Sequence, residues 1–574
     1  MPNEVHAHYV FFEAFGQKFL KKFGHVTKSL YICSVYIGTL KPKAMRKYPV
    51  GIQSFESIRK DGYIYVDKTP LIYKMITEGK PYFLSRPRRF GKSLLVSTLA
   101  AVFEGRRELF EAFTTADGIE QPQLFIATTN WKWEKHPVFH FDFSAGDLCD
   151  IEQLDTLIDE TLRHYEAQYS ITPKVKDANI RMIELLRTSH AQTGKRAVVL
   201  VDEYDNFILH SLGNAEKVEM ARHRFQNLFG PLKAEDDHLQ FVFITGISKF
   251  SQMGVFSKLN NLKNISMLIN YDWICGISEE ELTTQLHIDI EQLAAIRRET
   301  NDETLAELKR MYDGYHFSER MTDIYNPFSV IRALDSGEIK KYWFDSATPS
   351  ALFNMLRQMP PMELNDLDGK RCPDTAFDMA FDSFKNPLPV LYQSGYLTIK
   401  DYQPSRQMYT LGFPNYEVRT GFADSLYQMV SDTQSDDTAR NALQDAYFDF
   451  RDSGALPAFI DAIKTFYAGV PYHWEADNRN EHYYHALLYT LLTAFGADIR
   501  AEEPSAKGRS DLTLLMPKGI YVMELKYDGS ADAALAQINQ RGYANKYALD
   551  GRPITKVGIS FDPKERNISE WKAE

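Results

Sequence analysis

The chain is 574 residues long, and the usual domain size of roughly 100–200 residues predicts three or four domains. With 44% hydrophobic, 25% charged and 13% aromatic residues, it has the composition of a soluble globular protein. Its formal charge of −11 argues against a protein that coats itself in nucleic acid, although one domain could still carry a local basic groove.

Cysteine usage and hydropathy exclude further classes. None of the four cysteines forms a CxxC pair, so neither a zinc knuckle nor a disulfide framework is supported. A reducing cytoplasm is the simplest location. No uncharged apolar run reaches the roughly 18 residues of a membrane span, so we expect no membrane partner. The cysteines are Cys33, Cys149, Cys275 and Cys372.

The first 44 residues are aromatic and basic, with a short apolar stretch from Leu30 to Leu40. That stretch lies too far from the start for a good signal segment, and no clear small-residue cleavage site follows it. Orderly patterning begins after Met45. We interpret residues 1–44 as an N-terminal extension and leave open whether it is native or whether Met45 is the biological start.

A strand, a tight loop and a helix are predicted from residue 81 onward. Residues 81–85 have the pattern of a short buried strand, and Leu95, Leu99 and Val102 then recur at helical spacing. Gly-Lys-Ser at 91–93 opens the predicted helix. The N–H groups and the dipole of a helix start favour a bound phosphate, so this segment predicts a phosphate loop.

Two side chains of this loop have the chemistry that ATP needs. Lys92 can reach the β- and γ-phosphates, and the hydroxyl of Ser93 can ligate magnesium. The full motif would have glycine where this chain has Arg86, and Pro87 lacks an N–H to donate. Gly-Lys-Ser alone is therefore a weak signal, and a basic surface turn is the alternative.

A second acidic element strengthens the ATPase interpretation. Residues 197–201 form an unbroken apolar run, typical of a central parallel strand, and Asp202 and Glu203 follow it. Ligands bind at this carboxyl edge in open α/β sheets. Asp202 would hold magnesium and Glu203 would polarise the attacking water. The alternative is a strand that ends in solvated carboxylates.

Two more runs, 138–143 and 239–245, complete a predicted parallel α/β sheet with helical stretches between the strands. Thr245 ends its strand with a hydroxyl. That hydroxyl could sense the γ-phosphate or position water, and a simple strand cap is equally consistent.

The chain resembles the bacterial AAA-ATPase-like family, whose members typically carry a C-terminal nuclease-like domain of the PD-(D/E)XK superfamily. The resemblance runs from about Met45 to near the C-terminus. It rests on GIQSF at 51–55, YVDKT at 65–69, FLSRPRRFGKS at 83–93, LVDEYD at 200–205, FITGISKF at 243–250, YNPF at 325–328 and LYQSGYL at 391–397. In that family Arg86 is a regular part of the phosphate loop.

The resemblance implies a magnesium-dependent ATPase with Ser93 and Asp202 on the metal and Glu203 as catalytic carboxylate. The expected ATP-binding residues are Arg89, Phe90, Gly91, Lys92, Ser93, Leu94, Asp202 and Thr245.

Three arginines of the loop add positive charge beside the expected phosphates. Arg86, Arg88 and Arg89 could neutralise the triphosphate or contact nucleic acid, and a solvated basic loop is the alternative. No arginine finger can be assigned. In a homo-oligomer it would come from a neighbouring subunit.

The middle of the chain, about 286–470, is aromatic-rich and mostly helical in pattern. Residues 397–401 and 407–411 predict a β-hairpin with a helix on each side. This pattern fits a winged-helix-like module that could touch DNA. A packing module is at least as consistent with it.

A second hairpin is predicted near the C-terminus, with strands at 508–516 and 519–526. A turn at Pro517 and Lys518 would place Asp511 opposite Glu524. Because side chains alternate along a strand, Lys526 then shares the face of Glu524.

This trio matches the Asp…Glu-x-Lys signature of the superfamily. Two carboxylates can hold Mg²⁺ or Mn²⁺ against a phosphodiester, and the lysine can orient water or stabilise developing charge. A salt-bridged hairpin is the alternative. Glu481, at a predicted helix start, is a candidate third metal ligand, although an ordinary N-terminal helix carboxylate is favoured. Gln537 is a further candidate site residue, although its spacing from Tyr543 does not fit the common Q-x-x-x-Y form.

The expected organisation is an extension (1–44), an AAA-like P-loop ATPase domain (45–285), a helical middle (286–470) and a PD-(D/E)XK nuclease-like α/β domain (471–574). The expected function is an ATPase that regulates or drives a metal-dependent nuclease, acting on DNA by superfamily analogy. The alternatives are an ATP-dependent switch or a partner-binding protein with a non-cleaving C-terminal domain.

Overall fold

The computed structural model describes residues 46–144, 150–211, 214–248, 261–344, 367–378, 387–430, 437–468, 481–505 and 508–574. The extension predicted at 1–44 lies outside these ranges. None of the helices within them is long and apolar enough to cross a membrane.

The N-terminal unit is built on a five-stranded sheet in which every pairing is parallel, in the order β4-β5-β6-β1-β7. The predicted parallel α/β sheet is thereby confirmed. Strand β5 is buried along its whole length, as its unbroken apolar run requires. The strands are β1 (Pro81–Ser85), β4 (Val138–Asp142), β5 (Ala197–Asp202), β6 (Leu239–Gly246) and β7 (Lys263–Asn264).

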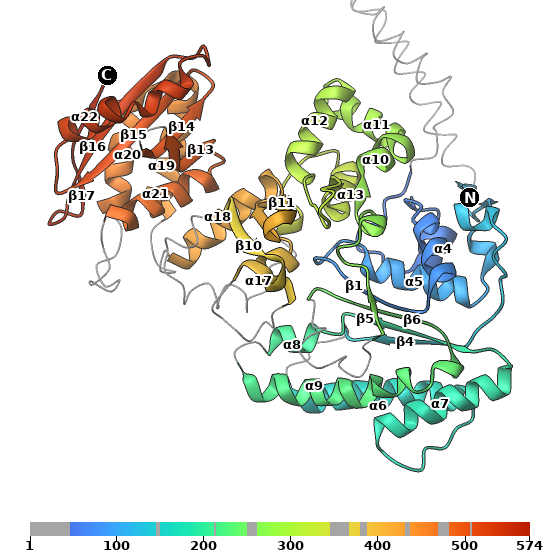
Figure 1. Cartoon of the computed structure of the whole chain (residues 1–574). Helices are drawn as coiled ribbons and strands as arrows, with labels where there is room; N and C mark the ends of the chain where they lie inside the picture. The colour runs from blue at the N-terminus through green and yellow to red at the C-terminus, as the bar shows by residue number, and fades with distance from the viewer. Residues whose placement is uncertain are drawn as a thin grey trace, which may run out of the picture.

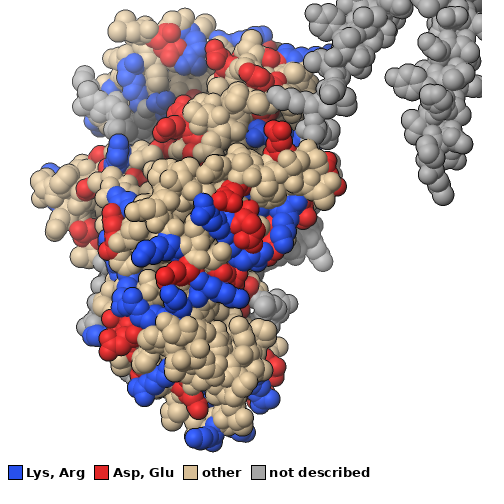
Figure 2. Space-filling model, turned by 90° about the vertical axis from the view of Figure 1, so that its right-hand side faces the viewer, with Lys and Arg blue, Asp and Glu red and all other residues tan. Residues whose placement is uncertain are grey.

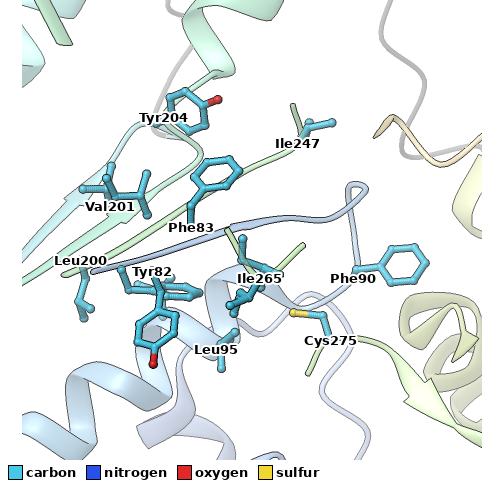
Figure 3. Packing of buried hydrophobic residues seen from close by; sticks show 14 of the residues in the cluster. Tyr82, Phe83, Phe90, Leu95, Leu200, Val201, Tyr204, Ile247, Ile265 and Cys275 are labelled. Atoms are coloured by element: carbon cyan, nitrogen blue, oxygen red, sulfur yellow. The ribbon is translucent and has the colours of Figure 1, made fainter. Parts of the chain in front are cut away.

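Helices cover both faces of this sheet, with α4 and α5 on one side and α6, α7 and α9 on the other (Figure 1). Side chains of β1 contribute to the core on both faces of the sheet, because Tyr82 and Phe83 point to opposite faces (Figure 3). The helices of the unit are α3 (Phe55–Lys60), α4 (Thr69–Glu78), α5 (Lys92–Phe103), α6 (Ile151–Gln168), α7 (Ala178–Thr193), α8 (Asn206–His210) and α9 (Ala215–Phe229). A short ribbon joins β2 (Phe113–Thr114) to β3 (Glu120–Gln121).

A helical group with its own core follows. Capping boxes start two of its helices, with Ser278 and Thr300 as the cap residues. Its elements are β8 (Ile277–Ser278), α10 (Glu279–Gln285), α11 (His287–Arg297), α12 (Asn301–Tyr312), β9 (Ile324–Tyr325) and α13 (Pro327–Ser336).

The predicted middle hairpin is present and forms part of a three-stranded antiparallel sheet, β10-β12-β11. A helix precedes the hairpin and another follows it, as expected. Its buried side chains share the core of the N-terminal unit. The elements are β10 (Lys370–Pro373), α17 (Leu388–Gln393), β11 (Thr398–Gln403), β12 (Met408–Gly412) and α18 (Tyr416–Val430).

The C-terminal unit is a five-stranded sheet, β13-β14-β15-β16-β17, with one parallel pair at its centre. Helix α22 packs against β15 and β16, while α19, α20 and α21 share a hydrophobic core with the sheet. The elements are α19 (Asp437–Ser453), α20 (Leu456–Ala468), α21 (Glu481–Ala494), β13 (Ile499–Ser505), β14 (Gly508–Met516), β15 (Gly519–Tyr527), α22 (Ala531–Arg541), β16 (Ile554–Asp562) and β17 (Asn567–Ala573).

This core bears on the expected domain boundary at 470. Tyr447, Phe450 and Phe459, on helices α19 and α20, lie in the same cluster as the strands of the C-terminal sheet. We therefore propose that the C-terminal unit begins before Leu443, because both helices would otherwise expose their apolar faces.

Candidate nucleotide and metal sites

The loop between β1 and α5 has the backbone of an anion site. Gly91 adopts φ 91° and ψ 20°, a left-handed conformation that suits glycine, and it forms the N-cap of α5. No side chain among the described residues caps this helix. Its first N–H groups and its dipole are therefore directed at the loop, where a phosphate would be stabilised.

Lys92 is buried at the centre of this loop. Its ammonium group donates to the carbonyl oxygens of Arg86 and Pro87, each at 3.1 Å. The lysine thus spans the loop from the start of the helix to the end of β1. A phosphate oxygen could take the place of these carbonyls as its partner.

Strand order brings two further predicted residues, Thr245 and Asp202, to this loop. Because β6 lies between β1 and β5, Thr245 stands between the phosphate loop and Asp202. Burial raises the pKa of the Asp202 carboxyl to about 6, although the nearby Ser93 hydroxyl and Lys92 ammonium act in the opposite direction. Among the described residues, the buried atoms Asp202 Oδ1 and Thr245 Oγ1 have no hydrogen-bond partner.

Such oxygens fit a magnesium nucleotide. A hydroxyl and a carboxylate are ligands that magnesium accepts alongside phosphate oxygens. A buried oxygen without a partner costs free energy that a cation or a phosphate would recover. Ser93 and Asp202 are therefore the residues that would hold the metal.

Glu203 follows Asp202 in a strained conformation. Its φ is 49°, in the left-handed region that residues other than glycine seldom adopt. Strain of this kind costs roughly 1–3 kcal/mol and concentrates at functional sites. The side chain is half-buried, which leaves it accessible to a bound water.

Arg86 does not act as the sequence interpretation supposed. Its side chain is 2% exposed and its guanidinium donates to carbonyl oxygens, including those of Ser266 at 2.6 Å and Tyr271 at 3.1 Å. It also lies over the ring of Phe317, 3.9 Å from the centroid. The expectation that Arg86 neutralises the triphosphate or contacts nucleic acid is wrong, because the side chain is buried and its Nη1 and Nη2 groups hold the loop to the segment after β7. Its Nε has no hydrogen-bond partner among the described residues.

The other predicted loop residues are placed differently from one another. Phe90 is buried and packs edge-on against Tyr315 and Phe317, so its side chain faces the core and only its backbone borders the loop (Figure 3). Arg89 is exposed, with its guanidinium 5.0 Å from the ring centroid of Phe328. Leu94 is half-buried in the first turn of α5.

Sequence reasoning missed two aspartates at the same edge of the sheet. Asp205 is fully buried and accepts the N–H groups of Ile247 and Ser248, so it fixes the turn after β6. Asp142 ends β4 in register with Asp202. The motif LVDEYD contained Asp205, but only the fold shows which turn it holds.

The C-terminal hairpin has the predicted register. Leu512 pairs with Met523 and Met516 with Gly519, the alignment that places Asp511 beside Glu524. One carboxylate oxygen of Asp511 accepts the N–H of Leu525 at 2.7 Å. The ammonium group of Lys526 donates to Glu524 at 3.2 Å. The structure therefore brings the predicted trio together.

Glu524 is a buried carboxylate with a raised pKa. It is 1% exposed, and burial together with the charge of Asp511 raises its pKa to about 7. The amide of Gln537 donates to Glu524 Oε1. Its other oxygen, Oε2, is buried without a hydrogen-bond partner among the described residues. A divalent cation would relieve both the lost hydration and the repulsion between the carboxylates.

Gln537 and Tyr543 meet although their spacing is irregular. The helix α22 ends in a left-handed Gly542, which turns the chain so that the Tyr543 hydroxyl lies 3.3 Å from the amide of Gln537. Sequence reasoning assigned no role to His485. Its ring donates to the backbone carbonyl of Asp511 at 2.7 Å, so it connects α21 to β14, the strand that carries Asp511.

The metal-binding capacity of the trio rests on Asp511 and Glu524. Residue Glu481 begins α21, but its side chain lies outside the described residues. The described part of the chain holds no group of three histidine, cysteine or acidic side chains placed to bind one ion. Water and substrate oxygens would complete the coordination, which suits magnesium or manganese better than zinc.

Comparison with known proteins finds a matching family model for each of the two units that carry these residues. A family model described as "Predicted AAA-ATPase" matches residues 49–256, and one described as "PD-(D/E)XK nuclease superfamily" matches residues 479–571. The chain is 33% identical over 535 residues to a protein of Azotobacter chroococcum mcd 1 titled "Uncharacterized protein in vnfD 5'region". That similarity covers 91% of this chain and 98% of its relative. The chain therefore belongs to the family of AAA-ATPase-like proteins that carry a C-terminal domain of the PD-(D/E)XK nuclease superfamily.

Proposed function

We propose that the protein binds and hydrolyses ATP, and that its ATPase unit regulates or drives metal-dependent cleavage of nucleic acid at the C-terminal site. The observation that carries the proposal is the buried carboxylate of Glu524, which lies beside Asp511 and Lys526. One of its oxygens has no hydrogen-bond partner in the part of the chain that the structure describes. Such a group is costly unless a cation neutralises it, so function explains it better than stability does.

At the N-terminal site, the loop N–H groups and Lys92 would bind the β- and γ-phosphates. Ser93 and Asp202 would hold magnesium, which neutralises charge that develops on the phosphates. Glu203 would accept a proton from the attacking water, and Thr245 would place that water or contact the γ-phosphate. The buried oxygens of Asp202 and Thr245, which have no hydrogen-bond partner within the described ranges, support this division of roles.

At the C-terminal site, Asp511 and Glu524 would hold magnesium or manganese, which polarises the phosphoryl group and acidifies a bound water. Lys526 would orient that water or stabilise the developing negative charge. Gln537 would keep Glu524 in position through its hydrogen bond. We favour DNA as the substrate by analogy with the superfamily, and the cytoplasm as the location because Cys275 and Cys372 are free thiols.

A matched pair of variants tests the cleavage proposal. Full-length protein would be incubated with DNA and with RNA, in Mg²⁺ or Mn²⁺, beside Lys526→Ala and the surface control Lys564→Ala. We expect cleavage by the wild type and the control, and a loss of about 100-fold or more in Lys526→Ala. Equal cleavage by Lys526→Ala and the wild type would show that a different site, or a contaminant, acts.

A second function is an ATP-dependent switch whose C-terminal domain binds without cleaving. The net charge of −11 favours it, as does the interleaving of acidic and basic side chains on the face in Figure 2. Under this alternative, ATP hydrolysis would be lost in Lys92→Ala while no metal ion supported cleavage of any nucleic acid.

A further inference from the structure

The phosphate loop is held from outside the ATPase sheet by one tryptophan. Trp343 is fully buried, and its indole N–H donates to the carbonyl of Arg88 at 2.9 Å. A Cβ on Gly395 would lie 2.7 Å from Pro87, so the turn before β11 also presses directly on the loop. A movement of the loop on phosphate binding would therefore also displace Trp343 and the turn at Gly395.

Trp343 is fixed in turn by the first turn of α18. The carboxylate of Glu417 accepts the backbone N–H of Trp343 at 2.7 Å and the N–H of Tyr342, and the hydroxyl of Ser329 donates to it at 2.8 Å. Glu417 is fully buried. A buried carboxylate bonded to several donors is rigid, because a shift of any donor leaves charge uncompensated.

The same helix contacts the C-terminal unit. Arg419, two residues after Glu417, donates to the carbonyl of Ile499 at 3.0 Å, at the start of β13. Tyr416 packs so tightly on Gly496 that a Cβ there would lie 1.8 Å from its hydroxyl. Helix α18 also packs along α21 and lies between the two units in Figure 1.

The contacts continue to the carboxylate trio. Helix α21 carries His485, whose ring binds the carbonyl of Asp511, and β13 pairs with β14 on both sides of that residue. A displacement of α21 would therefore shift Asp511 without any change in the pairing of β14 with β15.

We propose that α18 couples the nucleotide site to the C-terminal site. A movement of the phosphate loop would displace Trp343 and, through it, Glu417 on α18. Arg419 on the same helix would transmit this displacement to β13 and α21. This proposal rests on the function proposed above and assigns its regulation. Coupling between sites in proteins typically changes affinity or rate by about 5–150-fold.

The test uses full-length Arg419→Ala, with Arg451→Ala on the neighbouring helix α19 as the control for lost charge. Arg451 pairs only locally with Asp452 and lies over Phe448 in the described structure. We expect Arg419→Ala to keep its ATPase rate and its cleavage without ATP within about twofold, while the effect of ATP on cleavage falls from about fivefold or more to about one. Arg419→Lys, which keeps one donor, should restore part of the effect. An unchanged ATP effect in Arg419→Ala would overturn the proposal.

A second readout separates this proposal from the nuclease itself. Hydrogen exchange of α21 and β13 is measured with and without a non-hydrolysable ATP analogue. We expect the analogue to change exchange at least about threefold in the wild type and not in Arg419→Ala, whether or not any substrate is cut. If the analogue changes exchange but no nucleic acid is cleaved, the proposed nuclease activity is refuted and the proposed coupling stands. No response in the wild type would refute the coupling.

Discussion

Replacing Glu524 with glutamine should stabilise the metal-free protein at alkaline pH. The carboxyl is 1% exposed, and burial beside Asp511 raises its pKa from 4.5 to about 7. Between these values the unfolded chain loses the proton and the folded protein keeps it. The folded state therefore binds more protons, and its stability falls as the pH rises from about 4.5 to about 7.

The magnitude follows from the size of the shift. One pKa unit corresponds to about 1.36 kcal/mol. A Glu524 carboxyl with a pKa of about 7 would therefore lower the free energy of unfolding by about 2.5 kcal/mol between pH 5 and pH 8. Glutamine keeps an oxygen that can accept from Lys526 and carries no charge. The free energy of unfolding of Glu524→Gln, relative to that of the wild type, should therefore rise by about 2 kcal/mol between pH 5 and pH 8.

Native-state hydrogen exchange of the β14 and β15 amides in EDTA measures this difference locally, which matters because a chain of several units need not unfold in one step. Comparing variant and wild type at each pH cancels the intrinsic exchange rate. Glu565→Gln removes a carboxylate from an exposed loop and serves as the control. A stability difference for Glu524→Gln that does not change with pH would refute the reasoning.

Three further variants test the nucleotide site. Lys92→Ala should lower ATP hydrolysis by about 100-fold or more, because it removes the cation that spans the loop; hydrolysis near the wild-type rate in a phosphate-release assay would exclude the site. Thr245→Val should lower hydrolysis by about tenfold or more without lowering the melting temperature, since its hydroxyl has no partner among the described residues; a lower melting temperature with normal hydrolysis would make the hydroxyl structural. Arg86→Met should destabilise the protein by roughly 1–3 kcal/mol in urea unfolding, because it removes the side-chain donor to the carbonyl oxygen of Ser266. An unchanged unfolding midpoint together with weaker ATP binding would instead indicate that Arg86 acts on the phosphates.

Local pattern was sufficient to predict the elements that carry the chemistry. The run that became β5 has no polar interruption, so only a strand buried on both faces suits it, and its end placed Asp202 correctly. The turn at residues 517–518 determined the register of the second hairpin, so the proximity of Asp511 and Glu524 could be predicted without the fold.

Contacts between distant segments could not be predicted in this way. The partners of Arg86 lie about 180 residues further along the chain, so its charge suggested a ligand when its donors in fact bind carbonyl oxygens. Gln537 and Tyr543 meet only because Gly542 reverses the chain after α22, which no fixed spacing would indicate. Trp343 carried no motif at all, since its importance lies in a hydrogen bond to a loop more than 250 residues before it.

The central claim is that one chain combines an ATP site with a metal-dependent nuclease site. Its most direct test is the cleavage of supercoiled and linear DNA in Mg²⁺ or Mn²⁺, with and without ATP, by the wild type, Asp511→Ala and Lys92→Ala. We predict that Asp511→Ala abolishes cleavage under every condition and that Lys92→Ala removes only the dependence of cleavage on ATP. Cleavage that survives in Asp511→Ala, or that responds to ATP equally in Lys92→Ala and the wild type, would contradict the claim.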